Sequence, residues 1–225
     1  MSMGNKNDGR FEVTGAVGVS TNRRDSSDPN GYDANAPRGW HSRGYLPHFD
    51  GGELTQMVTF RLADSFPRHL LTDWADELAR MPEQQAATER SRRIEAYLDK
   101  GSGSSWLRNE RIAHIVQDAL LYFDGNRYRL CAWVIMPKHV HVVVTPLYGH
   151  DLSDIVPSWK AYTARLANRI LNRQGDFWYR DYYDRVIRDD RHFTAAVTYV
   201  EANPVRACLC VNAKDWTFSS AAYAS

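Results

Sequence analysis

The sequence predicts a single α+β domain built around a small antiparallel β-sheet. The chain has 225 residues, enough for one well-buried domain with extensions. Short segments rich in β-branched residues alternate with amphipathic segments, and two of the short segments are joined by only two residues. Residues 1–43 are instead polar and rich in Gly, Asn, Asp and Ser, so we expect a flexible leader there and the folded domain over residues 44–225.

The first half of this domain contains one predicted strand and several predicted helices. Residues 54–62 (LTQMVTFRL) predict a core strand because apolar and β-branched side chains dominate. Residues 67–99 show the helical spacing of apolar side chains and predict two helices separated at Pro82. Residues 112–122 repeat that spacing and predict another helix.

The second half begins with two strands. Residues 128–136 (YRLCAWVIM) and 139–145 (HVHVVVT) predict an antiparallel hairpin, because Pro137 and Lys138 alone connect them. A helix with an apolar stripe follows over residues 158–173.

The last predicted helix covers residues 191–201. We expect Asn203-Pro204 to end it, since proline lacks the N–H group that a helix interior requires.

The composition is that of an ordinary globular protein. Hydrophobic residues make up 43% of the chain, and no apolar run approaches the roughly 20 residues that span a bilayer. With no apolar segment typical of a secretory signal, we expect a cytoplasmic protein. Three cysteines without a paired motif argue against disulfides and structural zinc. The formal net charge of +1 neither indicates nor excludes a nucleic-acid partner, so such a site requires local clustering of charge.

Two histidines lie two residues apart in the second strand of the hairpin. His139 and His141 therefore leave the same face of the strand, and Val140 leaves the opposite face. This spacing can present two imidazole nitrogens to one metal ion. The same pattern is typical of a polar face on a half-exposed strand, so the pair does not decide the function by itself.

Tyr199 and Asn203 are four residues apart near the end of the last predicted helix, on one face about a turn apart. A nucleophilic hydroxyl and an amide ligand can converge there. Taken singly, a tyrosine ring more often packs in a core, and Asn203 also suits a helix cap ahead of Pro204.

Basic residues gather in two segments. The helix of residues 158–173 contains no acidic residue, and its cations are Lys160, Arg165, Arg169 and Arg173. Like charges at this spacing destabilise a helix, and binding to a phosphate backbone would offset that cost. The alternative to DNA binding is a helix face that is simply exposed to solvent. Residues 177–188 (FWYRDYYDRVIR) interleave aromatic residues with arginines, a mixture suited to stacking bases and holding phosphates, or else to a protein core. Their arginines are Arg180, Arg185 and Arg188.

Three motifs, in this order, resemble the tyrosine transposases associated with repetitive extragenic palindromes (REP), part of the IS200-like superfamily of HUH single-strand DNA transposases. They are MPKHVHVVVTP (136–146), YYDRVIRDD (182–190) and YVEANPVRA (199–207). The resemblance begins near residue 44 with GYLPHFD and extends to DWTFSSAAY at 215–223. It therefore covers nearly everything beyond the leader.

This resemblance implies a ferredoxin-like α+β fold of the HUH endonuclease type, with the histidine strand in mid-sheet and the tyrosine helix packed beside it. His139 and His141 match the HUH histidines, Tyr199 matches the nucleophile, and Asn203 matches the third metal-ligand position. Residues 68–105 are a helical insertion relative to the shortest members, and the resemblance implies no role for it.

The implied activity is that of a metal-dependent endonuclease and strand transferase. Relatives cleave single-stranded DNA near palindromic hairpins and remain attached through a 5′-phosphotyrosine. The cofactor is a divalent metal, Mg²⁺ or Mn²⁺; histidine ligands suit Mn²⁺ better, whereas Mg²⁺ is abundant in cells. The expected DNA contacts are Lys160, Arg165, Arg169, Arg173, Arg185 and Arg188.

The implied partner is single-stranded or hairpin DNA with REP-like palindromes, not a membrane. We expect a monomer or a homodimer that associates with the nucleoid when it is bound to DNA.

Two other functions fit parts of the pattern. A domesticated hairpin-DNA-binding protein without transposition activity is the main alternative, against which the presence of all four site residues argues. A nucleotide hydrolase of the histidine-triad type needs a further histidine where this chain has Val143, and is set aside.

Overall fold

The computed structural model describes residues 39–42, 47–50, 52–65, 67–99 and 103–223. Most of the predicted leader lies outside these residues, but its last part contains β1 (Gly39–Ser42), which pairs antiparallel with β2 (Pro47–Asp50). No helix in the described ranges is long and apolar enough to cross a membrane.

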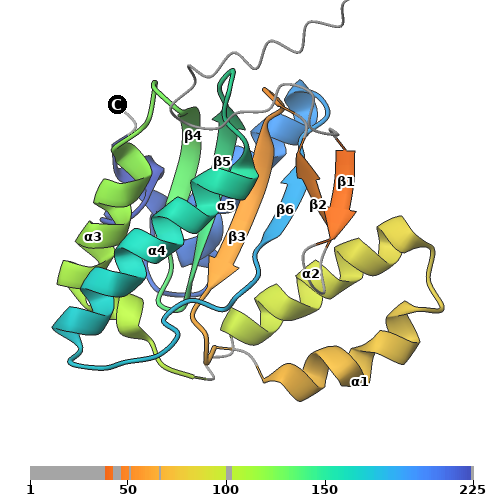
Figure 1. The fold of residues 1–225 in the computed structure, drawn as a ribbon, viewed down its shortest axis with the longest axis horizontal. Helices are drawn as coiled ribbons and strands as arrows, with labels where there is room; N and C mark the ends of the chain where they lie inside the picture. The colour runs from red at the N-terminus through yellow and green to blue at the C-terminus, as the bar shows by residue number, and fades with distance from the viewer. Residues whose placement is uncertain (1–38, 43–46, 51, 66, 100–102, 224–225) are drawn as a thin grey trace, which may run out of the picture. The chain divides into compact units, whose positions relative to one another are not determined.

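A four-stranded antiparallel sheet forms the centre of the described domain (Figure 1). Its strands are β3 (Gln56–Arg61), β4 (Tyr128–Ile135), β5 (His139–Pro146) and β6 (Tyr183–Val186). Their order across the sheet is β4-β5-β3-β6. Helix α3 (Glu110–Leu121) connects β3 to β4, and α4 (Leu152–Ile170) connects β5 to β6. This βαββαβ order with the first and third strands in the middle is the ferredoxin-like arrangement, as predicted.

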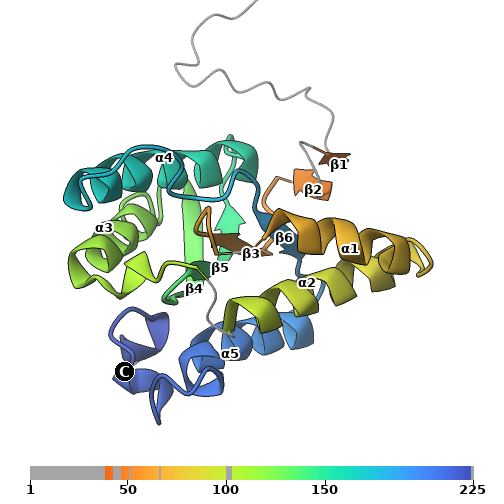
Figure 2. The same cartoon turned by 90° about the horizontal axis from the view of Figure 1, so that it is seen from below.

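Helices cover both faces of the sheet. Figure 2 shows α3 and α4 on one face and α5 (Asp190–Arg206) on the other. Successive side chains of β5 alternate between the two faces. Val140, Val142 and Val144 are fully buried in the larger core with α3 and α4, whereas Val143 belongs to the smaller core beneath α5. The histidine strand is therefore covered on both sides.

Strand β4 pairs with β5 on one edge and with the C-terminal segment on the other. The predicted two-residue turn is present, with the Met136 N–H donating to the His139 carbonyl at 2.8 Å. On the outer edge of β4, the Ile135 N–H donates to the Phe218 carbonyl at 2.8 Å, and Trp216 Nε1 donates to the Ile135 carbonyl at 3.0 Å. The C-terminal segment thus covers an edge that would otherwise expose unpaired backbone groups.

Residues 67–99 form two helices separated at Pro82, as predicted: α1 (Arg68–Leu78) and α2 (Glu83–Asp99). The chain re-enters the domain at Gly103, where φ is +81° and a Cβ atom would lie 2.4 Å from the Asp64 carbonyl oxygen. Beside it, the Ser104 N–H donates to Asp64 Oδ2 at 3.1 Å. Glycine is required at this close approach, which anchors the end of the insertion next to its start.

Helix α4 begins earlier than predicted, at Leu152 rather than at residue 158, and Pro157 lies inside it. Proline in a helix interior costs about 3 kcal/mol. The additional turns bury Leu152, Ile155 and Val156, each worth roughly 1.5–3 kcal/mol. The burial outweighs the lost hydrogen bond.

Helix α5 does not end at Asn203-Pro204 but continues to Arg206. Pro204 falls in its last turn, where a missing N–H removes one hydrogen bond, and the Ala207 N–H still reaches the Asn203 carbonyl at 2.9 Å. The interpretation of Asn203 as a cap is therefore wrong, because Ala207 occupies the C-cap position.

Candidate functional site

The two histidines of β5 lie on the face of the sheet that α5 covers. Their ring centroids are 4.6 Å apart, and the two residues are 2% (His139) and 0% (His141) exposed. The interpretation as a polar face on a half-exposed strand is wrong, because α5 packs over this face. A pair of buried imidazoles needs polar partners or a ligand.

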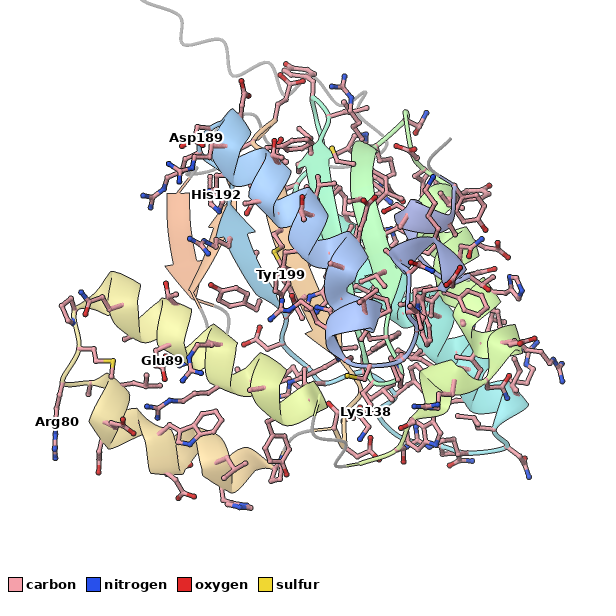
Figure 3. The ribbon with its side chains drawn as sticks, turned by 180° about the vertical axis from the view of Figure 1, so that it is seen from behind. Arg80, Glu89, Lys138, Asp189, His192 and Tyr199 are labelled. Carbon is pink, nitrogen blue, oxygen red and sulfur yellow. The ribbon has the colours of Figure 1, made fainter. Side chains whose placement is uncertain are left out.

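Tyr199 belongs to helix α5 and is labelled in Figure 3. The helix starts at an N-cap, where Asp189 Oδ1 accepts a hydrogen bond from the His192 N–H at 2.7 Å. Further along, the Tyr199 ring contacts the His141 ring edge-to-face, with centroids 5.6 Å apart. One turn later, Asn203 is 4% exposed. One chain thus supplies the two histidines, the tyrosine and the asparagine.

Each predicted metal ligand carries a buried polar atom that has no hydrogen-bond partner among the described residues. These atoms are His139 Nδ1, His141 Nε2 and Asn203 Oδ1. Such an atom costs about 1–3 kcal/mol when it stays unsatisfied, so each of the three is suited to binding a ligand. Imidazole nitrogen and amide oxygen are both ligands of divalent metal ions. The residues present therefore fit a divalent cation.

The described ranges hold no group of three or more His, Cys, Asp or Glu side chains arranged to bind a metal ion. The candidate set differs from such a group because its third member is an asparagine. An amide ligand adds no negative charge, so the site would leave the full cation charge to act on a phosphate.

Burial keeps both imidazoles uncharged. It lowers the pKa of His139 to about 3, and the charge of Lys138 adds to the effect. Burial also lowers the pKa of His141 well below its usual value, assisted by His139 and Arg206. Neutral imidazole is the form that binds metal ions.

Two further residues contact the site, and neither was among the residues predicted from the sequence. Thr59 Oγ1 lies 2.8 Å from His141 Nδ1, in a buried hydrogen bond between neighbouring strands. The Arg206 guanidinium lies over the Tyr199 ring, 4.7 Å from its centroid. Arg206 follows Tyr199 at helical spacing, which could have indicated this contact. The predicted helix ended before Pro204, however, and so did not include Arg206. No local spacing connects Thr59 to His141.

Two of the predicted DNA-binding cations make contacts within the protein. Lys160 Nζ donates to the Arg180 carbonyl at 2.7 Å, and burial lowers the pKa of this lysine to about 8. Arg173 donates to the Asp176 carbonyl at 3.2 Å and lies 4.1 Å from the Trp106 ring centroid. Both side chains hold neighbouring loops.

The other four predicted cations are exposed, on different faces of the domain. Arg165 and Arg169 belong to α4, on the opposite side of the sheet from α5 (Figure 2). Arg185 pairs in register with Met57, which packs in the core beneath α5, so Arg185 shares the face of the histidines. Arg188 lies just before α5. The structure therefore does not bring the six cations into one surface.

Most aromatic side chains of residues 177–188 belong to the core. Phe177, Trp178 and Tyr182 are buried, and Trp178 Nε1 donates to Thr163 Oγ1 at 2.8 Å. Stacking on a base needs an exposed ring face, so the core alternative holds for these three.

Comparisons with known proteins show which proteins this domain resembles. The family model described as "Transposase IS200 like" matches residues 105–203, which contain all four site residues. A curated REP-associated tyrosine transposase of Escherichia coli (strain K12) is 25% identical over 130 residues, which cover 52% of this chain and 76% of that protein. A solved structure of a REP-associated tyrosine transposase bound to a REP hairpin matches with a TM-score of 0.52 at 18% identity. That match covers 80% of this chain and 82% of the other and shows a shared fold.

Residues 105–203 are therefore similar to the IS200-like transposases. Within that class, the resemblance of the chain to the REP-associated tyrosine transposases is confirmed.

Proposed function

We propose that this chain is a divalent-metal-dependent endonuclease and strand transferase that cleaves single-stranded DNA through a 5′-phosphotyrosine intermediate. The observation that carries the proposal is the contact of Tyr199 with His141, beside three buried polar atoms without hydrogen-bond partners in the described residues. A nucleophile next to metal-ligand atoms suits metal-assisted phosphoryl transfer.

The substrate class follows from the named relatives. The Escherichia coli relative is a REP-associated tyrosine transposase, and the fold neighbour is one that is bound to a REP hairpin. The names support a REP-like hairpin as part of the substrate, and we propose that cleavage occurs in the single strand beside it.

In the proposed step, the phenolic oxygen of Tyr199 attacks phosphorus in line, and the bond from phosphorus to the 3′-oxygen breaks. The phenol proton passes to solvent, and the leaving oxygen takes up a proton to become a free 3′-hydroxyl. The phosphate stays linked to Tyr199 and to the 5′ end of the downstream strand. Attack by a 3′-hydroxyl in the reverse direction joins two strands and releases the tyrosine.

His139, His141 and Asn203 would hold the cation, Mn²⁺ or Mg²⁺. When bound, the cation offsets charge that develops on the phosphate oxygens. The two neutral imidazoles donate nitrogen lone pairs, and Asn203 positions its amide from a buried turn of α5. Because Tyr199 lies one turn before Asn203, one rigid helix positions the nucleophile and a ligand together.

We further propose that Arg185 and Arg188 guide the strand to Tyr199. Arg185 lies on the sheet face of the histidines, and both arginines are exposed. Arg165 and Arg169 on α4 would form a separate phosphate-binding surface for the duplex part of the hairpin.

The test is to trap the covalent product. Hairpin oligonucleotides with a single-stranded extension, labelled at either end, are incubated with protein and Mn²⁺ or Mg²⁺ and separated under denaturing conditions. We expect the label of the downstream fragment to migrate with the protein. Binding without cleavage would favour the DNA-binding alternative, and cleavage that leaves both ends free would indicate attack by water.

A further inference from the structure

Thr59 is placed to decide which nitrogen of His141 carries the ring proton. It lies opposite His141 in the register of β3 and β5, and its Oγ1 is 2.8 Å from Nδ1. Both side chains are buried, at 8% and 0% exposed. The other ring nitrogen, Nε2, has no hydrogen-bond partner in the ranges that the structure describes.

This hydrogen bond can form in two ways, with opposite consequences. The form of imidazole that can bind a metal ion is neutral and carries one ring proton. If the hydroxyl donates, the ring proton is on Nε2, which leaves a buried N–H without an acceptor and no lone pair for a cation. If Nδ1–H donates, the threonine oxygen accepts, and the Nε2 lone pair is available. The bond made by one nitrogen thus sets the role of the other.

We propose that the Thr59 hydroxyl accepts the Nδ1 proton of His141 and so keeps the Nε2 lone pair available to a divalent cation. Thr59 is then a positioning residue that acts through His141. The inference rests on the proposed function, since it takes His141 as a metal ligand. The two claims can be tested separately.

The first experiment reads the tautomer without any metal. In the metal-free protein with ¹⁵N-labelled histidine, two-bond ¹H–¹⁵N spectra distinguish the protonated ring nitrogen, and His141→Gln assigns the signals. We expect the proton on Nδ1 in the unmodified chain. In Thr59→Val, which keeps the shape and removes the hydroxyl, we expect a shift toward the Nε2–H form. A proton on Nε2 in the unmodified chain would overturn the proposal.

The second experiment measures Mn²⁺ binding by titration calorimetry. Thr59→Val should weaken the affinity about 10- to 100-fold, as is usual when the partner of a metal-bound histidine is lost. Thr59→Ser keeps the hydroxyl and should stay within about threefold of the unmodified chain. The matched control is Thr145→Val, which removes a β5 hydroxyl that bonds Thr55 Oγ1 at 2.8 Å but does not contact either histidine.

The outcomes separate the two claims. If the unmodified chain binds Mn²⁺ and Thr59→Val binds it equally well, the role of Thr59 is wrong and the proposed function stands. If the unmodified chain binds no Mn²⁺ even though its ring proton is on Nδ1, the metal-dependent function itself is contradicted.

Discussion

The ring of Tyr199 meets the ring of His141 edge-to-face, with centroids 5.6 Å apart and planes inclined at 78°. Arg206 lies over the same tyrosine ring, at 4.7 Å from its centroid. These contacts involve the ring and not the hydroxyl, so they position the side chain whether or not its oxygen is present. A phenylalanine at this position therefore keeps both of these ring contacts.

Tyr199→Phe should abolish cleavage and the protein–DNA adduct while leaving the fold and DNA affinity unchanged. The substitution removes the attacking oxygen and keeps both ring contacts, so we expect a loss of about a thousandfold or more in cleavage rate. Single-turnover assays and thermal unfolding measure the two properties. The control is Tyr183→Phe, a half-buried tyrosine opposite Thr59 on β6, which should keep the adduct. An adduct formed by Tyr199→Phe would refute the assignment.

Asn203→Leu should stabilise the metal-free protein and abolish Mn²⁺ binding. The side chain is 4% exposed, and its Oδ1 has no partner in the described part of the chain. Replacing an unsatisfied amide with an apolar group of similar size removes a desolvation cost of about 1–3 kcal/mol and improves helix propensity. Urea unfolding in the presence of EDTA checks the stability, and calorimetry checks the binding. A clear loss of stability would show that the amide has a structural partner.

Acid should destabilise the metal-free protein through the two buried histidines. The pKa of His139 is lowered to about 3 and that of His141 well below its ordinary value, mainly by burial, whereas both titrate near 6.5 in an unfolded chain. Below pH ~6.5 the unfolded state binds more protons than the folded state, so stability decreases as the pH falls toward ~3. The slope is at most about 1.4 kcal/mol per pH unit for each histidine.

Urea unfolding at about pH 7, 6 and 5 with EDTA measures this slope. His139→Gln removes one of the two groups and should make the dependence shallower. A slope that is unchanged by this substitution would assign the acid sensitivity to other residues.

Arg185→Ala and Arg165→Ala should differ in how they change the salt dependence of single-stranded DNA binding. Arg185 is on the histidine face of the sheet, whereas Arg165 is on α4 across the sheet. For a purely single-stranded oligonucleotide, we expect Arg185→Ala to reduce the slope of log affinity against log salt by about one unit. Arg165→Ala should leave that slope unchanged. Equal effects would contradict the proposed path of the strand.

Chains with complementary defects should not restore cleavage when mixed. Tyr199 contacts His141 within one chain, so His141→Gln and Tyr199→Phe chains each lack part of their own site. Adduct assays on the mixture should show no recovery above either variant alone. Recovery would show that the tyrosine helix is exchanged between chains.

Much of the fold and the site could be predicted from local patterns. The two-residue turn after Met136 imposes the hairpin, and the alternation of β5 puts His139 and His141 on one face. Helical spacing places Tyr199 and Asn203 on one side of α5. These relationships depend on residues close in sequence, so backbone geometry alone determines them.

The ends of the helices were predicted less well. Pro157 and Pro204 both indicate a break locally, yet α4 and α5 continue through them. The free-energy cost of one missing hydrogen bond can be read from the local sequence. The larger free energy gained by burying apolar side chains depends on elements distant in the sequence.

The sequence by itself determined the element order and the spacing of the candidate site residues, because these follow from periodicity, turn chemistry and motifs along the chain. Only the tertiary structure decided that both histidines are buried and neutral, that Thr59 bonds His141 across 82 residues of sequence, and that Arg173 holds a loop. Burial, strand register and hydrogen-bond partners are properties of pairs of elements. They exist only once α5 has packed on the sheet and removed one face of β5 from water.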